Sequence, residues 1–115
     1  MKKLDQVIEN YFLYFKKKEI HNLEKILTSN FILKDWKINL KSREKFIKFY
    51  KKNFMNVNIK IKIRKVIINK KKNIAICIIN VFINTKKISV IDVLYFNKQN
   101  RIKQISAYLI NNEKF

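Results

Sequence analysis

Hydrophobic and polar positions follow two different periods along the chain. In the first half, apolar residues recur three and four positions apart, which places them on one face of a helix. This spacing predicts a first helix over residues 4–17 and a second over residues 20–27. Ser42 is a suitable N-cap for a third helix that ends near Phe54. The first helix carries the longest apolar stripe: Leu4, Val7, Ile8, Tyr11, Phe12 and Phe15.

The second half has the alternating or continuously apolar pattern of β-strands. Strands are expected over four segments: residues 57–64, 74–83, 88–96 and 102–110. The second of these is almost wholly apolar and predicts a central strand covered on both faces. A shorter strand is expected over residues 31–36. Because the chain has no glycine, Asn73, Asn84 and Asn100 are the expected residues for left-handed turn positions.

A packed core is expected despite a large positive charge. The chain has 115 residues, of which 48% are hydrophobic, and its net charge is +19. Disordered chains lack such a hydrophobic fraction. Ile, Lys and Asn make up more than half of the residues, as in proteins from AT-rich genomes. The charge is therefore weaker support for a nucleic-acid partner than it would be in an ordinary composition.

No segment has the pattern of a membrane or secretion signal. Residues 1–10 are basic but lack the continuous apolar segment of a signal peptide. The longest apolar stretch, residues 74–83, is about half of the ~20 residues that a membrane-spanning helix needs. We therefore expect one cytoplasmic domain over residues 1–115, without membrane insertion.

Asp92 is the most anomalous residue, since it lies in mid-strand on the face shared by Val90 and Leu94. A carboxylate on an apolar face must be paired, hydrogen-bonded or protonated. Two interpretations are open: a structural carboxylate held by a buried donor or a lysine, and a carboxyl group with a raised pKa in a pocket. Asp35 lies near the end of the short strand, where a solvated acid is the simpler interpretation.

Several other kinds of site are disfavoured by residue type. His21 is the only histidine, is expected to be exposed and has no neighbouring metal ligand, so we expect no zinc site. Cys77 is expected to be a buried reduced thiol. The lysine clusters fall at the ends of elements, and Arg, which reads base edges and phosphates best, is scarce. Binding to nucleic acid is therefore possible but not favoured.

The order of these segments resembles the NTF2-like superfamily, in its SnoaL-like and ketosteroid-isomerase-like branch, over nearly the whole chain. Residues 7–27 are similar to the opening helix pair of that family, with Glu19 in the place of the acid that follows the first helix. Residues 42–50 are similar to the segment that opens the third helix. Residues 90–102 are similar to the hairpin of the last strands, with Asn100 in the place of a glycine.

The resemblance implies an α+β fold of the NTF2-like cone type, in which three N-terminal helices pack on a strongly curved, mainly antiparallel sheet around a pocket. It also implies a homodimer through the convex face of the sheet. A small apolar carbonyl or phenolic compound is the implied ligand, with no cofactor and no metal. Four residues are expected to line the pocket: Phe15, Trp36, Phe54 and Leu94.

Within the branch, the ketosteroid isomerases are the closest template for chemistry. The likeness places Tyr11 at the oxyanion tyrosine and Tyr50 at a supporting tyrosine that hydrogen-bonds it. Asp35 falls at the catalytic base, and Asp92 falls at a protonated acid. The resemblance implies that Asp35 moves a proton next to a carbonyl, while Tyr11 and neutral Asp92 donate hydrogen bonds to the dienolate oxygen.

Two alternatives belong to other functional classes. A non-catalytic binding or dimerisation module of this fold predicts a pocket closed by Phe, Trp and Ile side chains. A basic protein that binds anions or nucleic acid through its net charge predicts an affinity that falls steeply with salt.

Overall fold

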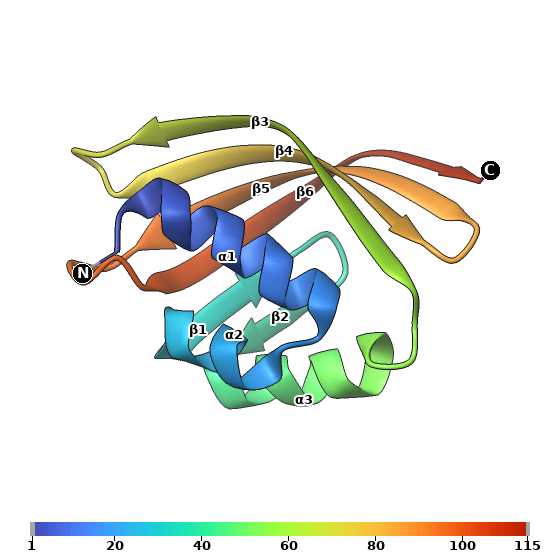
Figure 1. Ribbon diagram of the computed structural model, residues 1–115, viewed down its shortest axis with the longest axis horizontal. Helices are drawn as coiled ribbons and strands as arrows, with labels where there is room; N and C mark the ends of the chain where they lie inside the picture. The colour runs from blue at the N-terminus through green and yellow to red at the C-terminus, as the bar shows by residue number, and fades with distance from the viewer. Residues whose placement is uncertain (1, 115) are drawn as a thin grey trace.

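Three helices in the first half of the chain pack against one face of a curved, unclosed six-stranded sheet, which makes an α+β fold (Figure 1). The computed structural model describes residues 2–114, and residues 111–114 by their backbone alone. Helix α1 (Leu4–Lys17) lies beneath the long curved strands, whereas α2 (Ile20–Ile26) and α3 (Arg43–Phe54) lie beside the two short strands of the sheet. This arrangement leaves the opposite face of the sheet uncovered by helices.

The helices form where the periodicity places them. The predicted bounds of α1 are confirmed, while α2 ends at Ile26, one residue earlier than expected. The predicted N-cap of α3 is also confirmed, because Ser42 Oγ accepts a hydrogen bond from the backbone N–H of Lys45 at 3.0 Å. The cap satisfies one of the N–H groups that a helix start leaves without an intrahelical partner.

The sheet joins the two halves of the chain. Four long strands form an antiparallel meander: β3 (Ile59–Asn69), β4 (Ile74–Ile83), β5 (Lys86–Phe96) and β6 (Ile102–Lys114). The strand order is β2-β1-β6-β5-β4-β3, so β6 lies inside the sheet rather than at its edge. Its second neighbour is β1 (Leu27–Lys34), which pairs with it in parallel and places Leu33 opposite Ile105.

The prediction of a short strand over residues 31–36 was wrong at both ends. Strand β1 begins at Leu27, since Leu27 and Phe31 are fully buried, and it ends at Lys34. Asp35 and Trp36 lie in the bend that follows. The three-residue strand β2 (Asn39–Lys41) pairs with β1 and was not predicted, because so short a segment has no readable period.

Asparagine replaces glycine at the tight turns, as predicted. Asn73, Asn84 and Asn100 have φ of 54°, 54° and 60°. A fourth left-handed residue, Lys18 with φ of 62°, ends α1 and was not predicted. Its Nζ donates a hydrogen bond to the Val57 carbonyl oxygen at 2.6 Å, which anchors this turn to the segment after α3.

The core lies between the helices and the inner face of the sheet. On β4, Ala75, Cys77 and Ile79 are buried in it, as the inward positions of an alternating strand are. Cys77 is a free, buried thiol, as predicted. The expectation that β4 is covered on both faces was wrong: Ile76 points to the other face and is 38% exposed, because no helix packs there.

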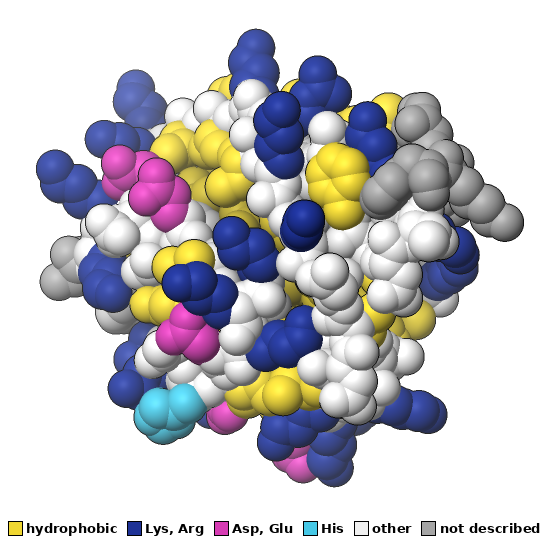
Figure 2. Space-filling view, turned by 45° about the vertical axis from the view of Figure 1, so that its right-hand side comes forward, with side chains coloured by type: hydrophobic (Ala, Val, Ile, Leu, Met, Phe, Trp, Pro, Cys, Tyr) yellow, Lys and Arg dark blue, Asp and Glu magenta, His cyan; other side chains and the backbone are white. Residues whose placement is uncertain are grey.

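The surface is rich in lysine. Figure 2 shows Lys and Arg side chains spread over the visible face rather than gathered in one patch, with the only histidine exposed among them. Among the described helices, none has both the length and the apolarity to cross a membrane.

Candidate functional site

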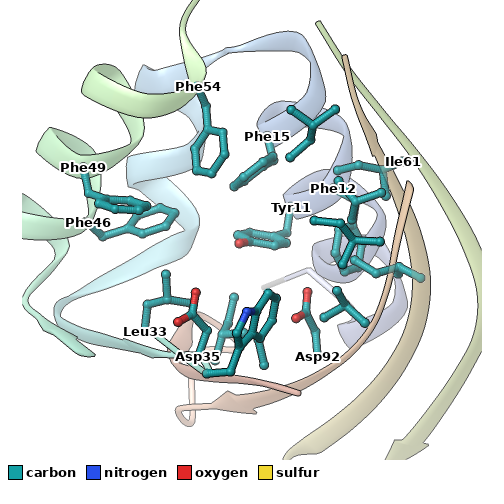
Figure 3. A pocket seen from close by; sticks show the side chains of 18 residues that line it. Tyr11, Phe12, Phe15, Leu33, Asp35, Phe46, Phe49, Phe54, Ile61 and Asp92 are labelled. Carbon is teal, nitrogen blue, oxygen red and sulfur yellow. The ribbon is translucent and has the colours of Figure 1, made fainter. Parts of the chain in front are cut away.

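A cavity of about 200 Å³ lies between α1, α3 and the inner face of the sheet (Figure 3). Its walls are almost wholly apolar, and Tyr11, Asp35 and Asp92 are the residues with polar oxygen atoms in it. The remaining lining residues are hydrophobic: Phe12, Phe15, Leu33, Trp36, Phe46, Phe49, Phe54, Ile61, Ile79, Val81, Ile83, Ile88, Val90, Ile105 and Ala107. A concave apolar site with few converging polar groups is typical of ligand pockets.

The fold brings the three polar residues together from distant parts of the chain. Tyr11 comes from the buried face of α1, and Asp92 comes from the inward face of β5, between Cys77 on β4 and Ala107 on β6. Asp35 comes from the bend after β1. Figure 3 shows the Tyr11 hydroxyl and both carboxyl groups directed into the same space.

The position of Asp35 is fixed by its own loop. Its Oδ1 accepts hydrogen bonds from the backbone N–H groups of Lys37 and Ile38, each at 2.7 Å. The backbone N–H of Asp35 donates to the Ile38 carbonyl oxygen at 3.0 Å, which closes the turn. Both hydrogen bonds fall on this one oxygen, so Oδ2 has no partner among the described residues. Asp35 is therefore a half-buried carboxylate at the cavity rather than a freely solvated acid.

Burial changes the protonation of the other two groups. The pKa of Asp92 rises from its ordinary 3.8 to about 7, first because the carboxyl is desolvated and second because the Asp35 charge repels its own. Burial also raises the pKa of the Tyr11 phenol well above 10, and the Asp92 charge adds to this effect. Near pH 7, Tyr11 is thus a hydrogen-bond donor, and Asp92 exists in both protonated and ionised forms.

Asp92 has no partner among the side chains that the structure describes. It is 8% exposed, its carboxyl group makes no hydrogen bond within the described residues, and no Lys, Arg or His lines the cavity. The described residues therefore do not support the interpretation in which a buried donor or a lysine holds Asp92. Tyr11 is 4% exposed, and its hydroxyl is likewise free of hydrogen bonds within the described chain.

Two expected site residues lie elsewhere. The Tyr50 hydroxyl donates its proton to the carbonyl oxygen of Phe15, so it cannot also donate to Tyr11, as the likeness to ketosteroid isomerases implied. Tyr50 instead supports the cavity wall, with its ring 4.9 Å from the Phe15 ring in a T-shaped contact. Leu94 is fully buried in the core and does not line the cavity.

Phe15, Trp36 and Phe54 do line the cavity, but most of the wall was not predicted. Phe12 belongs to the apolar stripe of α1, which predicted a buried face but no cavity, and Phe46 and Phe49 lie on α3, for which only the bounds were predicted. The other wall residues on β3 to β5 occupy inward positions, which alternation at every second residue could have identified. Periodicity gives the inward face of each element, but it does not show where facing elements leave a space.

The arrangement suits acid–base chemistry rather than metal chemistry. The Asp35 carboxyl group, the Asp92 carboxyl group with its raised pKa and the neutral Tyr11 phenol provide a candidate base and two candidate hydrogen-bond donors in an apolar space. Within the part of the chain that the structure describes, no three His, Cys, Asp or Glu residues lie together as metal ligands.

No family model and no curated protein matches the sequence. Solved structures do match over nearly the whole chain. The epoxide hydrolase/cyclase-like enzyme SalBIII, of pyran ring formation in the polyether salinomycin, has a TM-score of 0.87 at 10% identity, over 97% of this chain and 95% of that one. A putative ketosteroid isomerase from Kribbella flavida has a TM-score of 0.83 at 7% identity, over 97% and 81%.

A third solved structure is itself described as NTF2-like. An NTF2-like protein of unknown function from Cytophaga hutchinsonii has a TM-score of 0.82 at 14% identity, over 96% of this chain and 92% of that one. The neighbours thus include ketosteroid-isomerase-like and epoxide hydrolase/cyclase-like enzymes, as well as proteins without a known activity. At these identities the likeness establishes the fold alone, and the chain has the NTF2-like fold.

Proposed function

We propose that the chain binds a small, largely apolar carbonyl or phenolic compound and acts on it as a cofactor-independent isomerase of the ketosteroid-isomerase type. The observation that carries the proposal is the convergence of Asp35, Asp92 and Tyr11 on one apolar cavity, with both carboxyl groups in different environments. Pairs of titratable groups whose surroundings separate their pKa values are the mark of acid–base sites.

In the proposed reaction, Asp35 takes a proton from the carbon next to the substrate carbonyl. The electron pair of that C–H bond moves into the conjugated system and places negative charge on the carbonyl oxygen. Tyr11 and neutral Asp92 donate hydrogen bonds to this dienolate oxygen, which stabilises it most where water is excluded. Asp35 then returns the proton to the γ-carbon, which completes the isomerisation without any further reactant.

The reaction of a one-ring substrate tests the proposal. Cyclohex-3-enone converts to the conjugated cyclohex-2-enone, which ultraviolet absorbance follows directly. We expect Asp35→Asn to lower the rate by about 10²–10⁴-fold, because it removes the base. Asp5→Asn, which changes an exposed acid at the start of α1, is the matched control and keeps the full rate. Equal rates for the wild type and Asp35→Asn would contradict the isomerase role.

Ligand binding is measured separately from turnover. Trp36 is the only tryptophan in the chain and lines the cavity, so its fluorescence reports on occupancy. Phenols mimic the dienolate, and we expect Asp92→Asn to change their affinity without unfolding the protein. Binding of phenols without any turnover of the enone supports the alternative function, a non-catalytic binding module.

A homodimer through the outer face of the sheet also belongs to the proposal. Ile67 and Ile76 are register partners on this face, 49% and 38% exposed, and Tyr108 is 56% exposed on β6. Exposed apolar residues in such a charged chain indicate an interaction surface. Sedimentation at 0.15 M salt is expected to give a dimer, and Ile76→Glu is expected to give a monomer. A wild-type monomer at high concentration would contradict the dimer.

A further inference from the structure

We infer that the carbonyl or phenolic ligand of this cavity also carries a protonated or quaternary nitrogen on a one-ring or compact two-ring skeleton. This inference rests on the proposed ligand pocket and adds to it the charge and size of the ligand. It comes from the composition of the cavity wall, from its two carboxyl groups without cationic partners and from the cavity volume.

The sign of charge in the cavity is opposite to that of the molecule. The chain has 27 Lys and Arg residues against 8 Asp and Glu, and Lys and Arg side chains are spread over the visible face in Figure 2. Of the 18 residues that line the cavity, two are aspartates and none is Lys, Arg or His. Long basic side chains thus crowd the surface and are excluded from the one apolar space that holds Asp35 and Asp92.

Both carboxyl groups lack a cation. Asp92 is more than nine-tenths buried, and its carboxyl group has no hydrogen bond within the described chain. Asp35 has one carboxyl oxygen bonded to its own loop, and its other carboxyl oxygen has no hydrogen bond within the described chain. A buried carboxylate without a counter-charge is costly, and a bound cation removes that cost. A carboxylate ligand meets repulsion from Asp35 and Asp92 and finds no positive partner there.

The rest of the wall also favours a cation. Seven of the lining residues are aromatic: Tyr11, Phe12, Phe15, Trp36, Phe46, Phe49 and Phe54. The faces of aromatic rings attract ammonium groups, most strongly where water is excluded. Five of these rings form one connected group, in which neighbouring rings have centroids 5.1–6.0 Å apart: Tyr11, Phe12, Phe15, Phe49 and Phe54.

The positive surface does not overturn this preference. Exposed charges are screened over about 8 Å at physiological salt, so the surface lysines mainly slow the approach of a cation. An ammonium group inside the cavity lies within walls that include both aspartates, and salt screens such buried interactions less than it screens those at the surface. Direct contact therefore decides the equilibrium, and the surface charge affects the rate.

The volume limits the size of the ligand. A dry apolar cavity of about 150 Å³ holds benzene, and pockets for drug-sized ligands begin near 300 Å³. The cavity here, at about 200 Å³, lies between them. It suits one substituted ring or a compact pair of rings and is too small for a four-ring steroid skeleton.

Protonation of Asp92 makes the preference dependent on pH. The titratable groups that face Asp92 are Asp35 after β1, Tyr11 on α1 and Cys77 on β4, with Tyr50 on α3 behind Tyr11. Burial raises the pKa of Tyr50 and of Cys77 to about 12 each, so both stay neutral at pH 6–8. Between these pH values Asp92 is the group that ionises, and its charge adds to the attraction for a cation.

Three para-substituted phenols of one ring test the inference: tyramine, 4-ethylphenol and 4-hydroxyphenylacetate. Their tails are cationic, neutral and anionic, and Trp36 fluorescence measures their binding. We expect tyramine to bind about tenfold more tightly than 4-ethylphenol, and 4-hydroxyphenylacetate to bind weakest. Asp35→Asn is expected to reduce the preference for tyramine, whereas the control Asp5→Asn keeps it. In the wild type, the preference for tyramine is expected to increase from pH 6 to pH 8. In Asp92→Asn, the preference is expected to stay the same over this range.

The outcomes separate the inference from the function on which it rests. If 4-ethylphenol binds as tightly as tyramine, the charge assignment is wrong and the pocket stands. If none of the three phenols changes the fluorescence of Trp36, both are wrong. A preference for tyramine that survives in Asp35→Asn and in Asp92→Asn overturns the inference too, because the cation is then held elsewhere.

Discussion

Asp92→Asn is expected to stabilise the protein at neutral pH and to remove most of the dependence of its stability on pH. The side chain is buried, has no cationic partner among the described residues and faces the Asp35 carboxylate. Asparagine keeps its shape and cannot ionise. The substitution therefore tests the cost of the charge with little change in packing.

The magnitude follows from the pKa of Asp92, which is about 7 in the folded protein against its ordinary 3.8. One pKa unit corresponds to about 1.4 kcal/mol, so the ionised carboxylate costs the folded state roughly 4 kcal/mol. The folded state holds the proton more tightly than the unfolded state. This contribution to stability is therefore fully present below pH 3.8, falls as the pH rises and is lost above pH 7. Domains of this size have only about 5–15 kcal/mol in total.

Urea unfolding at a series of pH values from 4 to 8.5 measures the effect for the wild type, Asp92→Asn and the control Asp5→Asn. The difference between the wild type and Asp92→Asn is expected to be near zero at pH 4 and to grow by several kcal/mol by pH 8. Asp5→Asn is expected to follow the wild type. A difference that stays constant with pH would refute the reasoning, because it would show that Asp92 is ionised, or neutral, in both states alike.

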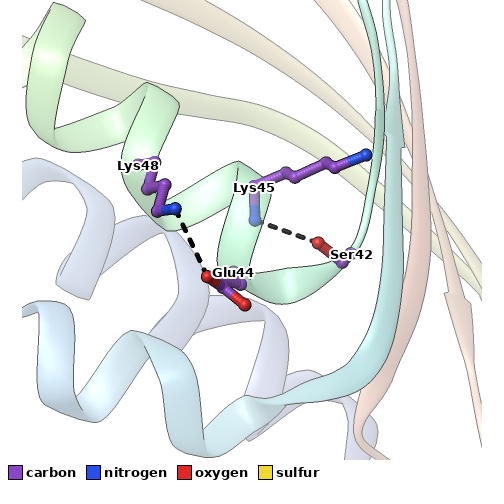
Figure 4. A network of polar contacts seen from close by, with 4 residues as sticks. All are labelled: Ser42, Glu44, Lys45 and Lys48. Carbon is purple, nitrogen blue, oxygen red and sulfur yellow. Dashed lines mark hydrogen bonds and ion pairs between the residues drawn. The ribbon is translucent and has the colours of Figure 1, made fainter.

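Three further substitutions test the fold. Ser42→Ala is expected to cost about 1 kcal/mol in urea unfolding, because the α3 cap is lost, whereas Glu44→Ala changes stability by less than about 0.5 kcal/mol, since its ion pair with Lys48 is 76–79% exposed (Figure 4). Equal losses would contradict this ranking. Tyr50→Phe is expected to cost roughly 1–3 kcal/mol by thermal unfolding, because the Phe15 carbonyl loses its donor; an unchanged midpoint would show that water replaces it. Asn84→Gly is expected to be tolerated and Asn84→Val to cost about 1–2 kcal/mol at φ of 54°, and similar melting curves for both would disprove the role of that turn.

Elements with a clear period were predictable from the sequence. The stripe from Leu4 to Phe15 defines α1, and alternation along β3 to β6 defines the meander, because burial of one face sets both patterns. The start of β1 at Leu27 was not predictable, since this strand is specified by parallel pairing with β6 more than seventy residues later. The local sequence pattern around Leu27 does not indicate a pairing strand so far away in the sequence.

The site was predictable in part for a similar reason. Asp92 stood out because a charge on an apolar strand face conflicts with its surroundings. Tyr11 and Asp35 received their roles from the family resemblance alone, since neither conflicts with its local pattern. The link from Tyr50 to the Phe15 carbonyl depends on how α3 crosses α1, and the cavity volume depends on how seven aromatic rings pack. These properties arise from tertiary packing and have no local signature.

The place of β6 in the sheet has a consequence for synthesis of the chain. Strand β6, which is synthesised after the other five strands, lies between β1 and β5. Strand β1 therefore cannot form its parallel pairing until β6 has been made. About 70 residues separate the end of β1 from the start of β6, which ribosomes add in roughly 3–14 s at about 5–20 residues per second. During that interval the pairing edge of β1 is open. Because the chain is rich in lysine, nascent copies of it repel one another during this interval. This repulsion protects the unpaired edge of β1 from pairing with a strand of another copy.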